Sequence, residues 1–189
     1  LRDVSVPLGI YNLHGRGAHW QDNILHLLED IKRTDPNQRN EIVETIIARF
    51  HTAPGAHSFE LSTENSVFSP LTADQITRLA SHPLITIGCH SHDHAILDQI
   101  SITQAIESIR TSKDILEKIT GLPIKHFAYP NGNYNAALID IVQDLKFSSA
   151  VTFLPGFYKR GENPFTIKRF GVGSDTSIDH FKVLLTGVF

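Results

Sequence analysis

Apolar residues along the chain alternate between short continuous runs and stretches in which they recur every three or four positions. The short runs predict buried strands, at residues 8–13, 84–89, 124–129, 148–154 and 166–172. The periodic stretches predict helices with one buried face, at residues 20–31, 41–50, 72–81, 101–120, 135–144 and from 178 onward. Strands that alternate with helices of this length indicate an α/β fold with a parallel sheet.

Capping residues support several of these boundaries. Thr72 is a suitable N-cap for the helix at 72–81, and Gly121 follows the helix at 101–120, where glycine commonly ends a helix. Residues 52–70 are rich in Ser, Pro, Gly and Asn and predict a long loop. The inward side of the helix at 101–120 is expected to carry its apolar residues, namely Ile102, Ala105, Ile106, Ile109, Ile115, Leu116 and Ile119.

Length and composition fit a single globular domain over residues 1–189. A hydrophobic fraction of 41% is enough for a sizeable core. No apolar run approaches the roughly 18 to 20 residues that span a bilayer, so no transmembrane segment is expected. With 17 Lys and Arg against 20 Asp and Glu, the net charge is −3, and no basic block is present. Nucleic acid is therefore not an expected partner.

Candidate chemistry is concentrated in histidine. The single cysteine, Cys89, excludes an internal disulfide and a cysteine-based zinc site, and we expect it to be a buried filler. His90 and His94 directly follow the predicted strand at 84–89, and residues four apart share a face of a helical turn. Two imidazoles at this spacing can bind one cation, although a polar loop with clustered histidines is the simpler alternative. His92, between them, is expected to be exposed.

The segment from Ile87 to His94, with the sequence IGCHSHDH, resembles the His-Ser/Thr-x-x-His motif of the polysaccharide deacetylase family, also called the NodB homology domain or carbohydrate esterase family 4. Other segments agree in order along nearly the whole chain. Phe127-Ala128-Tyr129-Pro130-Asn131-Gly132 resembles the motif of the Phe-Ala-Tyr-Pro-x-Gly branch. Lys168 to Val172 resembles a late strand that carries an arginine, and His19 to Asp22 an early segment with tryptophan.

This resemblance implies a distorted (β/α) barrel of fewer than eight strands and a metal-dependent hydrolase of acetamides on N-acetylated sugars. His90 and His94 would be ligands of a divalent ion, with zinc as the expected metal. Ser91 would pin the histidine loop by hydrogen bonding. The N–H of Asn131, next to Pro130, would help bind the oxyanion, and Arg169 would orient the basic carboxylate.

The same resemblance places substrate-binding residues at Tyr129, Pro130, Asn131 and Tyr134, of which the two tyrosines would line a sugar groove. One expected feature is absent from the printed sequence. The family's Thr-Phe-Asp-Asp motif, which supplies the base and the third ligand, has no counterpart, and Asp93 is expected to point away from the histidine pair. We therefore expect that motif, with the first barrel strand, to lie before residue 1, and these 189 residues alone to hold metal weakly and to lack turnover.

Two alternatives to a sugar deacetylase stay open. The first is a carbohydrate-binding relative of the same fold that has lost catalysis. The second is an amidohydrolase of the same fold that acts on a small non-sugar amide, for which an enclosed pocket rather than an open cleft is expected.

Overall fold

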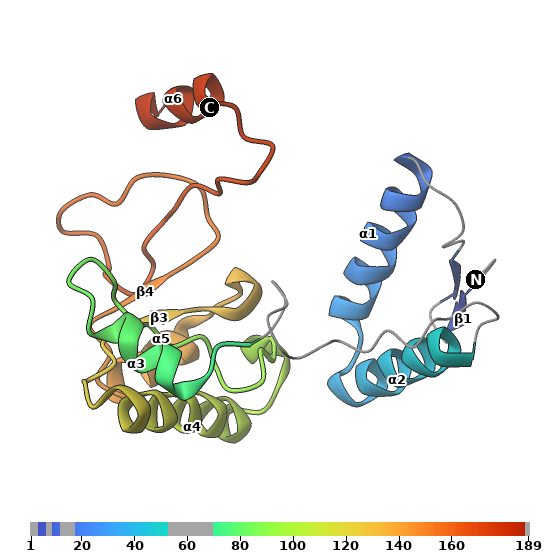
Figure 1. Cartoon of the computed structure of the whole chain (residues 1–189), viewed down its shortest axis with the longest axis horizontal. Coiled ribbons are helices and arrows are strands. Elements are labelled where there is room, and N and C mark those ends of the chain that lie inside the picture. Colours follow the sequence, from blue (N-terminus) through green and yellow to red (C-terminus); the bar gives the residue numbers. More distant parts are fainter. Residues whose placement is uncertain (1–3, 7–8, 12–17, 53–69, 188–189) are drawn as a thin grey trace. The chain divides into compact units, whose positions relative to one another are not determined.

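The computed structural model describes residues 4–6, 9–11, 18–52 and 70–187 (Figure 1). The chain divides into two compact units, Leu1–Pro70 and Leu71–Phe189, each of which is described by itself. That both belong to one domain stays a prediction. Most of the predicted loop at 52–70 lies outside the described residues, as does the side chain of Trp20 in the early segment with tryptophan.

The first unit contains a small hairpin and two helices. Strands β1 (Val4–Val6) and β2 (Gly9–Tyr11) pair antiparallel, so the strand predicted at 8–13 exists but is shorter. Helices α1 (Ala18–Arg33) and α2 (Pro36–Thr52) match the two predicted helices. Helix α2 begins at Pro36, ahead of the periodic stretch at 41–50, because Asp35-Pro36 offers a cap and proline suits the first turn of a helix. The buried cluster consists of Leu27 and Ile42, with Ile31 and Ile46 packed against them.

The second unit is built on parallel pairing. Strand β3 (His126–Ala128) pairs with β4 (Ser149–Val151), with Phe127 opposite Ala150. Single parallel bridges add one segment on each side, Cys89 beside Phe127 and Ile167 beside Val151. Helix α4 (Ile102–Thr120) connects the Cys89 segment to β3, and α5 (Ala136–Asp144) connects β3 to β4. This order confirms the α/β class, while closure into a barrel stays a prediction.

Two predicted strands are much shorter than expected. Of residues 84–89 and 166–172, only Cys89 and Ile167 form bridges. Leu84 is 87% exposed, because the chain turns at His82 after α3 (Ala73–Ala80). The N–H of Leu84 donates to His82 Nδ1, and the N–H of Ile85 donates to the His82 carbonyl, so these backbone groups are satisfied in a turn.

Helix termini agree with the capping residues in the sequence. Thr72 caps α3 and Ser101 caps α4, each in a reciprocal capping box with a glutamine. Gly121 ends α4 in the left-handed conformation that glycine adopts at low cost, with φ of 67°. Helix α6 (Ile178–Thr186) begins at the predicted residue. Within the described ranges, no helix combines the length and the apolar character needed to span a bilayer.

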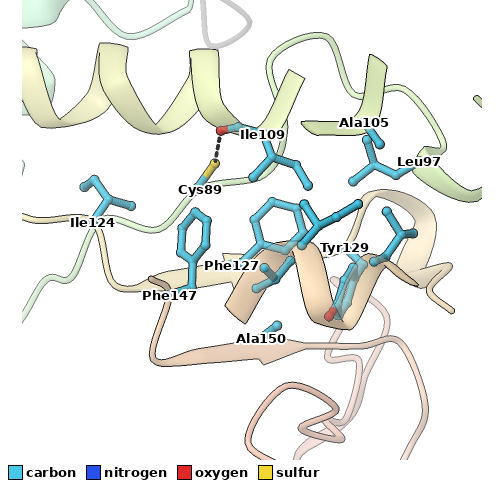
Figure 2. Close-up of a cluster of buried hydrophobic side chains, with 12 residues drawn as sticks. Cys89, Leu97, Ala105, Ile109, Ile124, Phe127, Tyr129, Phe147 and Ala150 are labelled. Carbon is cyan, nitrogen blue, oxygen red and sulfur yellow. Dashed lines mark hydrogen bonds between the residues drawn. The ribbon is translucent and has the colours of Figure 1, made fainter. Parts of the chain in front are cut away.

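The core of the second unit lies between the sheet and helices α4 and α5 (Figure 2). Phe127 is at its centre, next to Phe147 and Ile109. On α4 the buried positions are Ala105, Ile109 and Ser112, which follow the i, i+4, i+7 spacing of a single stripe. The expected inward positions of Ile102 and Ile115 are wrong, since both side chains are exposed.

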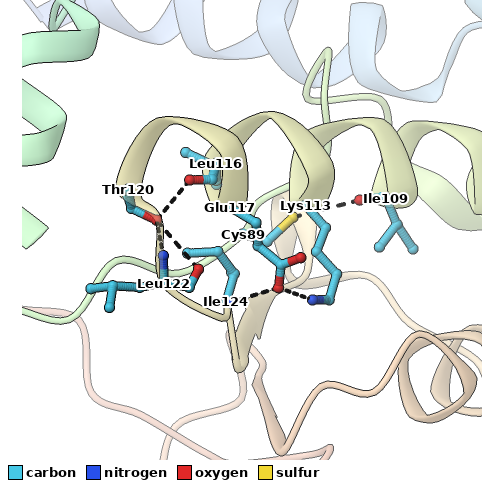
Figure 3. Close-up of polar contacts among 8 residues, drawn as sticks. All are labelled: Cys89, Ile109, Lys113, Leu116, Glu117, Thr120, Leu122 and Ile124. Atoms are coloured by element: carbon cyan, nitrogen blue, oxygen red, sulfur yellow. Dashed lines mark hydrogen bonds and ion pairs between the residues drawn. The ribbon is translucent and has the colours of Figure 1, made fainter.

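A polar network fixes the end of α4 to the start of β3 (Figure 3). Glu117 Oε1 pairs with Lys113 Nζ and accepts a hydrogen bond of 2.9 Å from the Ile124 N–H. These bonds hold the pKa of Glu117 below its usual value: the Lys113 hydrogen bond contributes most, followed by the Ile124 N–H. The network therefore sets the point at which the chain leaves the helix and enters the sheet.

Candidate active site

The histidine loop begins where the Cys89 segment ends beside β3. The Cys89 N–H donates to the His126 carbonyl at 2.8 Å, and the Ala128 N–H donates to the Cys89 carbonyl at 2.9 Å. His90 and Pro130 therefore follow neighbouring parallel segments at their carboxyl ends. This edge is where α/β proteins commonly build their sites.

His90 and His94 lie against each other. Their ring centroids are 4.8 Å apart and the ring planes cross at 81°, with His90 and His94 both exposed. The loop is not a helical turn, which corrects the local conformation assumed from the spacing. Ser91 and His94 instead adopt left-handed backbone angles, with φ of 63° and 57°. The change of backbone direction at these two residues accompanies the contact between the imidazole rings of His90 and His94.

A hydrogen bond to β3 orients His90. Its Nδ1 lies 2.7 Å from the Ala128 carbonyl oxygen. Because a carbonyl oxygen only accepts, Nδ1 carries the hydrogen, which leaves the lone pair on Nε2. Histidine ligands of metals are typically oriented by such a bond from the other ring nitrogen.

Asp93 and Ser108 anchor the loop to α4. Ser108 Oγ donates to Asp93 Oδ1 at 2.8 Å and accepts from the His92 N–H at 3.2 Å. Burial raises the pKa of Asp93, but the hydrogen bonds from Ser108 and from the Ala95 N–H outweigh it, so the pKa is below its usual value. The Asp93 carboxylate thus contacts Ser108 on α4, in agreement with the expectation that it points away from the histidine pair.

Ser91 does not have the role expected of it. Its hydroxyl is buried and has no hydrogen-bond partner among the described residues. The expectation that Ser91 fixes the loop by hydrogen bonding is wrong for this structure. The loop is instead fixed by the hydrogen bonds of Ser108 with Asp93 and with the His92 N–H. In the sequence, the contact of Ser108 with the loop is indicated only by its position, since it is a polar residue at the border of the buried stripe of α4.

The second part of the site is the turn η2 (Pro130–Gly132). Asn131 is exposed, and its left-handed backbone, with φ of 55° and ψ of 3°, departs from helical geometry at the middle of this turn. Gly132 also has positive φ, 76°, and a Cβ there would overlap Phe153 Cβ. The turn therefore requires glycine at this position.

Tyr129 and Pro130 support the turn from inside. Both are fully buried, so the exposed position expected for Tyr129 in a sugar groove is not found, and a substrate-binding role of either residue stays a prediction. Tyr129 stacks on Tyr134 at 5.3 Å and donates from its hydroxyl to the Phe165 carbonyl at 3.2 Å. Burial, followed by the proximity of Tyr134, raises the pKa of Tyr129. Tyr134 is only half-buried, and its contact with substrate stays a prediction.

Arg169 lies beside the turn. Its Nε donates to the Thr152 carbonyl at 2.7 Å, and its guanidinium carbon is 4.7 Å from the centroid of the Phe153 ring. No carboxylate within the described part of the chain forms an ion pair with it. Its role toward a basic carboxylate stays a prediction. Phe153, which is 64% exposed next to Gly132, was not predicted as a site residue.

The donor set at this edge fits part of a metal site. Two neighbouring imidazoles, one of them oriented by a carbonyl, suit a borderline cation such as zinc. A catalytic zinc site uses three protein ligands, and no group of three His, Cys, Asp or Glu suited to a metal occurs among the described residues. His90 and His94 would account for two of the three.

Comparison with protein families gives a match over residues 37–150 to the polysaccharide deacetylase model. The chain belongs to the polysaccharide deacetylase family. The matched region contains the histidine pair and the Pro130–Gly132 turn, so the family predicted from the sequence motifs is confirmed. The chain matches none of the curated proteins with which it was compared.

Solved structures of deacetylases resemble this chain in fold. The deacetylase PplD from Streptococcus pyogenes, in complex with acetate, has 24% identity and a TM-score of 0.57 over 67% of this chain and 54% of its own. A polysaccharide deacetylase from Bacillus cereus has 21% identity and a TM-score of 0.57 over 76% and 48%. IcaB from Ammonifex degensii has 20% identity and a TM-score of 0.54 over 64% and 55%. The chain thus spans about half the length of these proteins.

Proposed function

We propose that this member of the family hydrolyses the acetamide of N-acetylated sugars in an oligo- or polysaccharide, with the help of a divalent metal ion. The observation that carries the proposal is the contact between His90 and His94, whose ring centroids are 4.8 Å apart. The pair lies in the loop that follows the Cys89 segment, at the edge of the sheet where the parallel segments end. Membership of the polysaccharide deacetylase family supports hydrolysis of an amide on a sugar.

His90 and His94 would hold the metal. A bound divalent ion, with zinc as the expected one, would supply Lewis acidity and an activated water at neutral pH. The Ala128 carbonyl fixes the His90 ring, so that Nε2 is already directed when the ion binds. Ser108 and Asp93 hold the loop between the two histidines, which limits the movement of both rings.

The Pro130–Gly132 turn would stabilise the charge that develops on the acetyl oxygen. The left-handed Asn131 lies between a buried proline and a glycine that cannot accept a side chain, so its N–H is held in a fixed direction. Fixed backbone donors of this kind act in the transition state without reorganisation. Arg169, held by Thr152 beside the same turn, would orient a catalytic carboxylate.

A sugar polymer rather than a small amide is favoured by the exposure of the site. Both histidines, Asn131 and the ring of Phe153 are accessible at one edge of the sheet, and neither cavity described for the second unit includes them. An exposed aromatic ring beside the turn offers a face for a sugar ring. An enclosed pocket would instead favour a small amide.

The experiment is acetate release by the full-length protein from an N-acetylglucosamine oligomer and from a small aromatic acetamide. We expect release from the oligomer, loss of release after chelation, and recovery on addition of Zn²⁺. Turnover of the small acetamide alone would support the non-sugar alternative. Failure to release acetate from either substrate with metal present would contradict the proposal.

A further inference from the structure

A chain of three polar side chains connects η1 (Leu97–Gln99), the short helix that follows the histidine loop, to the Pro130–Gly132 turn. Asn131 Nδ2 donates to Asn133 Oδ1 at 2.8 Å. Asn133 Nδ2 in turn donates to the Asp98 carboxylate, at 3.1 Å to Oδ2 and 3.4 Å to Oδ1. The bond between Asn133 and Asp98 joins residues that are 35 positions apart in the sequence.

Asp98 and Asn133 are each attached to a buried group. Asp98 lies in η1 (Leu97–Gln99), next to the fully buried Leu97. Asn133 directly follows η2, whose Pro130 is buried, and its N–H donates to the Pro130 carbonyl at 3.2 Å. These hydrogen bonds therefore join two anchored elements rather than two mobile side chains, and they fix the distance between them.

The carboxylate also fixes the direction of the hydrogen bonds. A carboxylate oxygen accepts, so Asp98 takes the amide nitrogen of Asn133, and this turns Oδ1 of Asn133 toward Asn131. The Asn131 amide group can then only donate to that oxygen. The orientation of the exposed Asn131 side chain is thereby set by a residue on the other segment.

We propose that Asp98 and Asn133 are positioning residues that hold the oxyanion turn in register with the His90 and His94 loop. The proposal rests on the proposed function and adds two residues to it. Neither Asp98 nor Asn133 has to contact the metal or the substrate. Their effect on the reaction passes through Asn131 and the turn.

The chemistry of the pair allows a swap test. Asn133→Asp places a second carboxylate against Asp98, and two like charges at this distance repel. Asp98→Asn alone keeps an oxygen that can accept from Asn133. The double variant Asp98→Asn/Asn133→Asp reverses the pair, because the new amide at position 98 can donate to the new carboxylate at position 133. The other oxygen of that carboxylate still accepts from Asn131.

In the full-length protein loaded with zinc, we expect Asn133→Asp to lower kcat about tenfold with KM within about twofold, since only alignment of the turn is lost. The double variant should recover kcat to within about threefold of wild type. Asp98→Asn alone should also stay within about threefold. A reduction that the swap fails to recover, or a rise in KM with kcat unchanged, would overturn the proposal.

Amide hydrogen exchange of Gly132 provides a readout that does not need activity. The Gly132 N–H donates to the Tyr129 carbonyl at 2.9 Å, so its exchange reports on the closed turn. We expect faster exchange in Asn133→Asp and wild-type exchange in the double variant. Unchanged exchange in Asn133→Asp would overturn the proposal. If the wild type releases no acetate, the proposed function fails, and the exchange measurement still decides whether the connection exists.

Discussion

At the scale of single residues, backbone conformation determines which side chains meet. His90 and His94 contact each other because Ser91 and His94 have positive φ, a feature that spacing alone does not reveal. The motif placed Tyr129 in the substrate groove, whereas strand alternation places it on the same face as the buried Phe127, two residues earlier. Period-two alternation was therefore the better guide for this residue.

Cys89 provides a prediction about reactivity at this scale. Its thiol is buried, and the burial raises its pKa, which lowers the thiolate fraction at a given pH. We expect no measurable reaction with a disulfide reagent at mildly alkaline pH in the native protein, and reaction of the single thiol in guanidinium chloride. Rapid modification of the native protein would contradict the buried position.

At the scale of elements, the helices were predictable because their determinants are local. Thr72, Ser101 and Gly121 set helix ends through bonds to residues three or four positions away. The strand at 84–89 was overestimated, because backbone bonding around His82 competes with sheet pairing after α3. The contacts of Ser108 and Asp98 with the site were missed, since both join residues far apart in the sequence.

Gly132 gives a prediction for the turn, with Gly121 as its matched control. Both glycines have similar positive φ, but a Cβ at Gly121 would meet no atom within 4 Å, whereas at Gly132 it would overlap Phe153. We expect Gly121→Ala to lower the free energy of unfolding by about 1 kcal/mol. Gly132→Ala should cost roughly 1–3 kcal/mol more. Denaturant titrations of the two variants measure both losses. Equal losses in the free energy of unfolding would contradict the prediction, because the overlap with Phe153 would then cost nothing.

Glu117 gives a prediction for the junction between α4 and β3. Glu117→Ala removes the acceptor of the Ile124 N–H, and we expect a loss of about 1 kcal/mol in the free energy of unfolding, since the side chain is one-third exposed.

The effect of Glu117→Ala should also depend on pH. The pKa of Glu117 is lowered by folding, so the stability that Glu117 contributes is present above the unfolded pKa and is lost as the pH falls through the folded value. The difference from wild type should therefore shrink in acid. A difference that grows as the pH falls would contradict this assignment.

At the scale of the whole molecule, the family could be predicted, as could the placement of His90 and Pro130 at one edge of the sheet, while the complete catalytic set could not. The order of the motifs indicated the family, and the family match over residues 37–150 confirms it. Chain order also placed His90 and Pro130 after neighbouring strands, because parallel strands end at the same edge of a sheet. No third metal ligand is found beside the histidine pair among the described residues, so the metal proposal depends on that pair.

The metal content of two matched variants tests the central claim most directly. His92 lies between His90 and His94 in the same exposed loop, but its ring is not part of the contacting pair. After zinc loading and gel filtration of the full-length protein, we expect one ion per chain in wild type and in His92→Ala, and almost none in His94→Ala. Wild-type metal content in His94→Ala, or equal loss in both variants, would contradict the account.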